Sequence, residues 1–165
     1  MPVVDAETDD VVDRLDFSGG LSVSPDGTIL GVWDGNDVHF VDATSEESDL
    51  LGSVSLGERG PDDIEFYEDG GKWHAITANT LTDDVSVIDV DEGVILDHIP
   101  AGAIERPDGA RFLHRDGALG DGYYFTPAGA DGTVAIIDVA ARELLHEVEV
   151  GTGVDTISYI GTGDT

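Results

Sequence analysis

Residues 85–102 read VSVIDVDEGVILDHIPAG. Two stretches rich in valine and isoleucine, which favour strands, flank a polar segment that starts at Asp89 and carries the Asp and Gly residues typical of tight turns. No segment of the chain keeps a helical apolar period over three turns, and glycine occurs 22 times. Residues 85–102 therefore predict two strands joined by a turn.

The same phrase recurs along the chain at intervals of about 40 to 50 residues, with copies that begin at residues 3, 39 and 134. One aspartate precedes the turn in each of the four copies: Asp5, Asp42, Asp89 and Asp138. Because every copy needs the same turn, we interpret these aspartates as acceptors for backbone N–H groups of the turn, not as catalytic residues.

A second pair of strands precedes three of these phrases, in residues 21–35, 64–79 and 110–129. Each pair consists of a short strand, a turn rich in Asp and Gly, and another strand. The turns are SPDG, YEDGG and HRDG, which places the third turn at residues 114–117. A full repeat therefore carries four short strands, which is the sequence signature of a propeller blade.

The sequence thus predicts an all-β fold, a β-propeller of four-stranded antiparallel blades in one domain, residues 1–165. The predicted complete blades are residues 19–60, 61–104 and 105–153. Residues 1–18 and 154–165 are predicted to form a split partial blade from the two termini. A four-bladed ring with one defective blade, two chains pairing as half-rings, and an incomplete fragment all stay open. Unpaired strand edges at the split blade favour a homodimer that completes the ring.

The composition is strongly acidic, with 36 Asp and Glu residues against 7 Lys and Arg residues and a net charge of −29. The acids are spread between apolar runs, and hydrophobic residues make up 40% of the chain, so we predict a folded domain. Such a surface repels nucleic acid and anionic membranes. It stays hydrated in molar salt, where screening acts over about 3 Å. We therefore predict a protein of the haloarchaeal type, adapted to high salt.

The chain has no cysteine, which excludes disulfides, CxxC zinc sites and thiol nucleophiles. No apolar run approaches the length of about 20 residues that crosses a bilayer. The first residues are acidic and lack the basic and apolar regions of a signal peptide. We expect a cytoplasmic protein, or an exported one if the chain is a fragment that lacks its true N-terminus.

The repeat resembles the YVTN-type β-propeller repeat, most closely in residues 85–102 and in the SPDG turn at residues 24–27. The resemblance covers nearly the whole chain and implies a seven- or eight-bladed propeller, as in YncE-like proteins and, more distantly, the heme d1 propeller of cytochrome cd1 nitrite reductase. This chain has about half as many blades, and GVWDG, AITAN and YFTPA replace the tyrosine-rich strand. Because function varies widely within the family, the resemblance implies a fold and not an activity.

Aligning the repeats places three aspartates just before the innermost strand of a blade: Asp62, Asp108 and Asp155. That strand lines the central channel of a propeller, so the three carboxylates are predicted at one channel mouth, where their oxygens could hold a Ca²⁺ ion. Arg59 and Arg106 are close to two of these aspartates in the sequence. Local ion pairs between these arginines and the acids are the favoured alternative.

The sequence contains no nucleophile elbow, HExxH zinc motif, P-loop or dinucleotide-binding fingerprint. We therefore expect a non-enzymatic module that binds a protein or a small-molecule ligand through its channel mouth and loops. The alternative is a part of a redox enzyme or hydrolase of the heme d1, quinoprotein or lactonase kind, with its site at the same mouth. The scarcity of basic residues disfavours an acidic tetrapyrrole cofactor.

Overall fold

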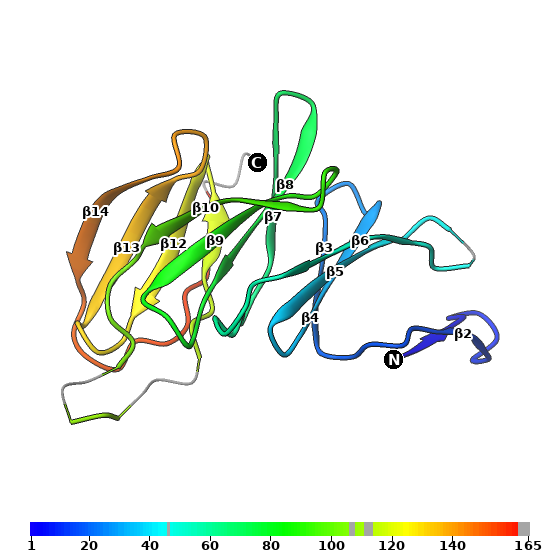
Figure 1. The fold of residues 1–165 in the computed structure, drawn as a ribbon, viewed down its shortest axis with the longest axis horizontal. Helices are drawn as coiled ribbons and strands as arrows, with labels where there is room; N and C mark the ends of the chain where they lie inside the picture. Colours follow the sequence, from blue (N-terminus) through cyan, green and yellow to red (C-terminus); the bar gives the residue numbers. More distant parts are fainter. Residues whose placement is uncertain (46, 106–107, 111–113, 162–165) are drawn as a thin grey trace.

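The computed structural model describes residues 1–45, 47–105, 108–110 and 114–161. Within these residues the chain forms fourteen β-strands and no helix, so no helix in the described part is long and apolar enough to span a membrane. The strands make three four-stranded antiparallel sheets and one two-stranded sheet. The three larger sheets follow one another across the molecule like the blades of a fan (Figure 1). The prediction of an all-β chain with four-stranded blades is confirmed.

Each large sheet is a meander in which strands that follow one another in sequence pair with one another. The strands of the first sheet are β3 (Gly20–Val23), β4 (Ile29–Asp34), β5 (Asp37–Asp42) and β6 (Leu50–Ser55). Those of the second sheet are β7 (Glu65–Asp69), β8 (Lys72–Ala78), β9 (Asp84–Asp89) and β10 (Val94–Pro100). The third sheet contains β11 (Ala118–Gly120), β12 (Tyr123–Ala128), β13 (Thr133–Asp138) and β14 (Glu143–Glu149).

The inner hairpin of the third sheet does not lie where the sequence predicted it. The predicted turn covered residues 114–117, but β11 begins at Ala118 and the turn consists of Asp121 and Gly122. Both residues have positive φ, 52° and 82°, the conformation that Asp-Gly favours in a two-residue hairpin. The prediction was wrong because its turn contains Arg115, whose side chain is fully buried and leads into the sheet.

The repeated aspartates act as predicted. In each copy Oδ1 accepts a hydrogen bond from a backbone N–H two or three residues later. The distances are 2.7 Å from Glu7 to Asp5, 2.8 Å from Thr44 to Asp42, 2.9 Å from Glu92 to Asp89 and 2.9 Å from Ala141 to Asp138. The backbone bond from Glu7 lowers the pKa of Asp5, and the hydroxyl of Thr44 followed by its backbone N–H lowers the pKa of Asp42. The aspartates therefore have a structural role in the turn between the two outer strands.

Neighbouring sheets pack face to face through two separate apolar cores. In the first core Phe40 and Phe66 meet edge to face with ring centroids 6.1 Å apart, and Trp33 and Trp73 pack against its margin. The second core, between the second and third sheets, consists of Ile76, Ala78, Val85, Val87, Ile99, Ala101, Tyr124, Ala135, Ile137 and Val139. The two central strands of the second sheet, β8 and β9, are the most deeply buried because both of their faces are covered.

The two ends of the chain do not meet in one blade. At one end, β1 (Pro2–Val4) and β2 (Val11–Arg14) form a separate two-stranded sheet. Residues 155–161 lie beside the third sheet instead, where the N–H of Ile157 donates to the carbonyl of Asp116 at 3.1 Å. The prediction that the two termini of one chain form a single split blade is therefore wrong, because three sheets lie between the two terminal segments.

Candidate functional site

The segments that lead into the innermost strands of the second and third sheets meet at one end of the molecule. β7 and β11 contact each other. When the two sheets are aligned by strand register, Asp62 is equivalent to Arg115, and Asp63 to Asp116. Each segment therefore brings two charged residues to the position that forms a channel mouth in a propeller.

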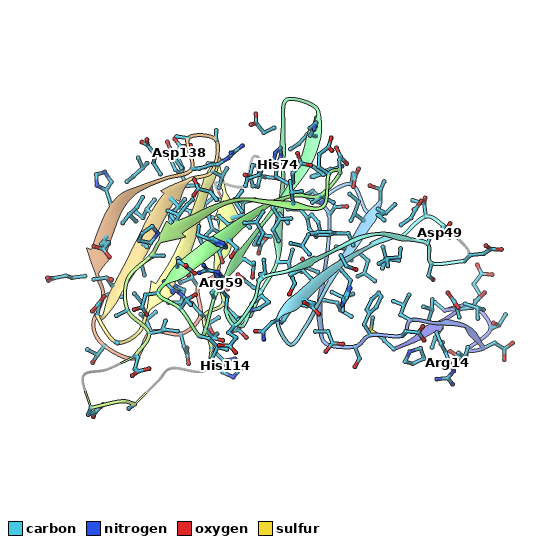
Figure 2. All side chains as sticks on the ribbon, viewed as in Figure 1. Arg14, Asp49, Arg59, His74, His114 and Asp138 are labelled. Carbon is cyan, nitrogen blue, oxygen red and sulfur yellow. The ribbon has the colours of Figure 1, made fainter. Side chains whose placement is uncertain are left out.

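Four side chains gather here, and we call Asp62, His114, Asp116 and Asp155 the mouth cluster. Asp62 Oδ2 accepts the backbone N–H of Arg115 at 2.6 Å and lies 3.6 Å from His114 Nδ1. The N–H of Asp116 donates to the carbonyl of Asp155 at 3.0 Å. Partial burial and the charge of Asp62 raise the pKa of Asp116; His114 opposes this shift and Asp155 adds to it. Figure 2 shows His114 at the end of the molecule opposite Asp138.

The predicted set of three aspartates is only partly assembled. Asp62 and Asp155 both lie close enough to Asp116 to shift its pKa. Asp108 is exposed, its Oδ1 accepts the N–H of Ala110 at 3.0 Å, and residues 108–110 project away from β7 and β11 (Figure 1). Asp116 supplies the third carboxylate that the sequence assigned to Asp108, because the third sheet starts later than the repeat predicted. By strand register the residue equivalent to Asp62 is Arg115, and Asp116 follows it.

The predicted arginine partners also differ. Arg59 forms its ion pair with Asp84, not with Asp62, and so joins the segment between the first two sheets to the first residue of β9. Arg106 lies outside the described residues. Within the described part of the chain, no group of three or more His, Cys, Asp or Glu side chains is arranged to hold a metal ion. The Ca²⁺ site therefore stays a prediction.

Behind the mouth cluster lies a buried carboxyl group between the second and third sheets. Asp63 accepts hydrogen bonds from the N–H of Ala78 at 2.8 Å, the N–H of Gly117 at 2.8 Å and the hydroxyl of Tyr124 at 2.7 Å. Burial raises the pKa of Asp63 to about 6 in spite of these bonds. A Cβ at residue 117 would lie 2.2 Å from the Tyr124 hydroxyl, so the close approach requires glycine there. The carboxyl group of Asp63 therefore accepts hydrogen bonds at both oxygens and stabilises the junction between the second and third sheets.

Arg115 is the largest fully buried side chain among the described residues. Its guanidinium donates to the carbonyls of Ala101, of Gly102 at 3.3 Å and of Thr82 at 3.4 Å, and Nε donates to Thr126 Oγ1 at 3.2 Å. Burial lowers the pKa of Arg115, and nearby acidic groups oppose that shift. The guanidinium of Arg115 therefore points into the junction between the second and third sheets and not toward the mouth cluster. There it donates to backbone carbonyls in the segments before β9 and after β10.

Sequence reasoning missed Arg115, Asp63 and Asp116. A signal was present, because Arg115 is one of only 7 basic residues and is followed directly by an acid. The HRDG string suggested an exposed turn instead, and only the register of β11 against β12 shows that these residues precede the strand. No comparable sequence signal indicates that Asp63 is buried, because it directly follows another aspartate.

The sequence matches no known protein family, and none of the curated proteins is significantly similar to it. Several solved structures share its fold. AztD from Citrobacter koseri superposes with a TM-score of 0.64 at 18% identity, over 88% of this chain and 38% of that chain. The Dos1 propeller gives a TM-score of 0.67 at 13% identity, over 95% of this chain and 44% of that one.

A third similar structure is the dihydro-heme d1 dehydrogenase NirN in complex with DHE, with a TM-score of 0.59 at 18% identity, over 81% of this chain and 28% of that chain. At these identities the likeness concerns the fold alone. The chain spans less than half the length of each of these three proteins. The sheets, their register and these likenesses together define a β-propeller fold of which this chain contributes three complete blades.

Proposed function

We propose that this chain is a non-enzymatic β-propeller module that binds a positively charged ligand or a basic protein segment at the mouth cluster. The observation that carries the proposal is the gathering of Asp62, Asp116 and Asp155 at one end of the sheets, where Asp116 is partly buried and Asp62 and Asp155 lie close enough to help raise its pKa. Like charges held together cost free energy, and a bound cation relieves that cost.

The surroundings of the cluster support a cationic ligand. Asp155 and His114 are exposed, whereas Asp62 and Asp116 are half-buried, so the carboxylates can be reached from solvent. Arg115 contributes only its backbone N–H to Asp62, and its guanidinium is turned inward. The mouth cluster therefore stays negative apart from the titratable His114.

The buried ionisable groups favour a binding module over an enzyme. A raised carboxyl pKa is typical of general acids, and Asp63 has one. However, Asp63 is buried and its oxygens accept hydrogen bonds from three donors, so it supports the packing of the sheets. The fold shared with NirN keeps a redox role as the second candidate, and a coloured or cofactor-bearing preparation would favour it.

The acidic surface supports function in molar salt. A net charge of −29 on 165 residues destabilises a compact state in dilute buffer and is screened in concentrated KCl. We propose that the protein works in a salt-rich cytoplasm, and we expect folding to require high KCl. The resemblance of its repeat supports the further proposal that it is a YVTN-type propeller of a halophile.

The proposal is tested by titrating the protein with a hexa-arginine peptide in KCl and following backbone amide chemical shifts. We expect the shifts to centre on Asp116, Gly117 and Ile157. Replacing Asp62, Asp116 and Asp155 together by Asn is expected to weaken binding at least tenfold. Three exposed aspartates elsewhere supply the matched control, Asp10, Asp37 and Asp91. Equal loss in both triple variants, or no binding by the wild type, would contradict a site at the mouth. The same titration with CaCl2 tests the predicted Ca²⁺ ligand.

A further inference from the structure

The first and third sheets lie at the two ends of the arc. Apolar residues are exposed there at positions whose equivalents in the second sheet are buried. The repeated aspartate of each copy fixes which residues are equivalent. Phe66 on β7 is 3% exposed against the first sheet, whereas the equivalent Val23 on β3 is 51% exposed. Ile99 on β10 is 4% exposed against the third sheet, whereas the equivalent Val148 on β14 is 46% exposed. Each end of the arc therefore has the face of a blade without a full neighbour.

The N-terminal hairpin covers only the outer part of the first open face. Val3 and Leu15 of this hairpin line a groove of about 270 Å³ with Val23, Leu30 and Val41 of the first sheet. Phe17 stacks on His39 at a centroid distance of 4.1 Å. The hairpin thus occupies the place of the two outer strands of a preceding blade, and no inner strands of that blade lie among the described residues.

The far face of the hairpin is itself uncovered. Val4 and Val41 both directly precede a repeated aspartate, and side chains alternate along a strand. Because Val3 faces the first sheet, Val4 points away from it. Val4 is 51% exposed, whereas Val41 is 2% exposed. The side of the hairpin that points away from the first sheet is therefore apolar, and none of the described residues packs on it.

The C-terminal segment supplies the complementary half. Residues 155–160, DTISYI, align with residues 62–67, DDIEFY, which lead into and form the innermost strand of the second sheet. Tyr159 stacks on Phe125 of β12 with ring centroids 6.1 Å apart and nearly parallel planes. A Cβ on Gly120 would lie 2.3 Å from the Tyr159 ring, so glycine makes room for it. The segment lies in the position of the innermost strand of a following blade.

The N-terminal hairpin and the C-terminal segment leave complementary parts of a blade uncovered. The C-terminal segment covers the inner part of the third sheet, leaves Val148 on the outer part exposed and presents Ile160, which is 94% exposed. The hairpin lacks inner strands and leaves Val23 of the first sheet exposed. Within one chain the two halves lie at different ends of the arc (Figure 1) and cannot join.

We infer that two copies of this chain pair head to tail, so that residues 155–161 of each copy complete the half-blade formed by β1 and β2 of the other. Each of the two interfaces repeats the packing seen between adjacent sheets of one chain. Two heterologous contacts of this kind close a ring when the rotation between copies is 180°. Each copy supplies three complete sheets, and the chain spans 44% of the Dos1 propeller, so two copies correspond to one propeller of that length. This inference does not depend on what the mouth cluster binds.

Light scattering on a sizing column in molar KCl tests the inference. We expect the wild type to elute with twice the 17.3 kDa mass of the chain, and to dissociate as KCl is lowered because both copies are strongly acidic. The double variant Val4→Asp, Ile160→Asp is expected to be a folded monomer, since both side chains are exposed in the single chain. The control Val94→Asp changes an equally exposed valine of the second sheet, which lies at neither end, and should stay dimeric. A wild type that is monomeric, or that forms open-ended oligomers, would overturn the closed pair.

A cysteine pair gives a second readout that does not depend on mass action. The chain has no cysteine of its own. In the proposed pair, Val4 of one copy faces the outer part of the third sheet of the other, where Val148 lies. The double variant Val4→Cys, Val148→Cys is therefore expected to give a covalent dimer on mild oxidation. Val4→Cys combined with Val94→Cys should not, and equal cross-linking of the two would contradict the arrangement.

Discussion

The two junctions between neighbouring sheets differ in how they are held together. Between the first and second sheets the contact is an apolar core with Phe40 and Phe66 at its centre. Between the second and third sheets a comparable core is accompanied by buried polar groups. The Tyr124 hydroxyl donates to Asp63, and the buried Arg115 donates to Thr126 and to backbone carbonyls.

The difference has consequences for stability. Apolar packing is non-directional and tolerates small shifts, and it does not respond to pH. A buried guanidinium and a buried carboxyl group must keep their partners, because an unpaired buried polar group costs free energy. The second junction is therefore the one that fixes the relative position of two sheets, and it is the one next to the mouth cluster.

The largest effect is expected for Arg115→Ala. This change removes the donors for the carbonyls of Ala101, Gly102 and Thr82 and opens a cavity. We expect a loss of about 4 to 5 kcal/mol in the free energy of unfolding, measured by urea denaturation in molar KCl. Arg115→Lys keeps the charge with fewer donors and should recover only part of this loss. Full recovery in the lysine variant would show that charge alone, and not the set of carbonyl contacts, holds the junction.

Phe66→Ala tests the apolar junction with a slightly smaller expected effect. It removes a ring that is almost completely buried against the first sheet, and such changes cost about 3 to 4 kcal/mol. The cost should be the same at pH 5 and pH 8, because the first core contains no ionisable side chain. Leu21→Ala, on the open face of the first sheet, is the control and should change stability by less than about 1 kcal/mol in the monomer. A pH-dependent cost for Phe66→Ala would contradict the contrast between the junctions.

Glu65→Gln is expected to give the smallest effect, with a pH dependence of defined sign. Burial and the charge of Asp63 raise the pKa of Glu65 from 4.5 to about 7. The folded chain therefore holds a proton that the unfolded chain releases between these values, so stability falls as the pH rises from about 4.5 to 7. The variant removes this loss and should be more stable than the wild type by about 1 to 2 kcal/mol at pH 8, after allowance for partial exposure.

The advantage of Glu65→Gln should disappear below pH 4.5, where the glutamate is protonated in both states. Urea denaturation at pH 4.5 and pH 8 measures both values. The exposed glutamate Glu143 is the matched control, and Glu143→Gln should show no such difference. An advantage for Glu65→Gln that is equal at both pH values would show that the ionisation of Glu65 is not its source.

Some features of the fold could be predicted from local sequence. The repeated Asp before a polar turn predicted the hairpin of the outer strands in all four copies, and the hydrogen bonds to Asp89 and Asp138 confirm it. These bonds span two or three residues, so the local sequence contains all the information they need. The predicted turn of the inner hairpin in the third sheet was wrong because the segment contains two Asp-Gly pairs, Asp116-Gly117 and Asp121-Gly122. Burial of Arg115 decides between them.

The candidate site was only half predictable. Asp62 and Asp155 were placed at the mouth by the repeat. Asp108 was placed there wrongly and Asp116 was missed, because the third blade carries extra residues before its first strand. The role of Arg115 depends on carbonyl groups of residues 82, 101 and 102, which are distant in sequence. No local pattern reports such a contact.

By itself, the sequence determined the four-stranded repeat, the outer turns and the negative charge, because these follow from side-chain alternation, backbone preference and charge over a few neighbouring residues. The tertiary structure decided which charges are buried, which carboxylates meet at the mouth and that the two termini lie apart. These features depend on how whole sheets pack against one another, and contacts between residues far apart in the chain are fixed only when the sheets have been brought together.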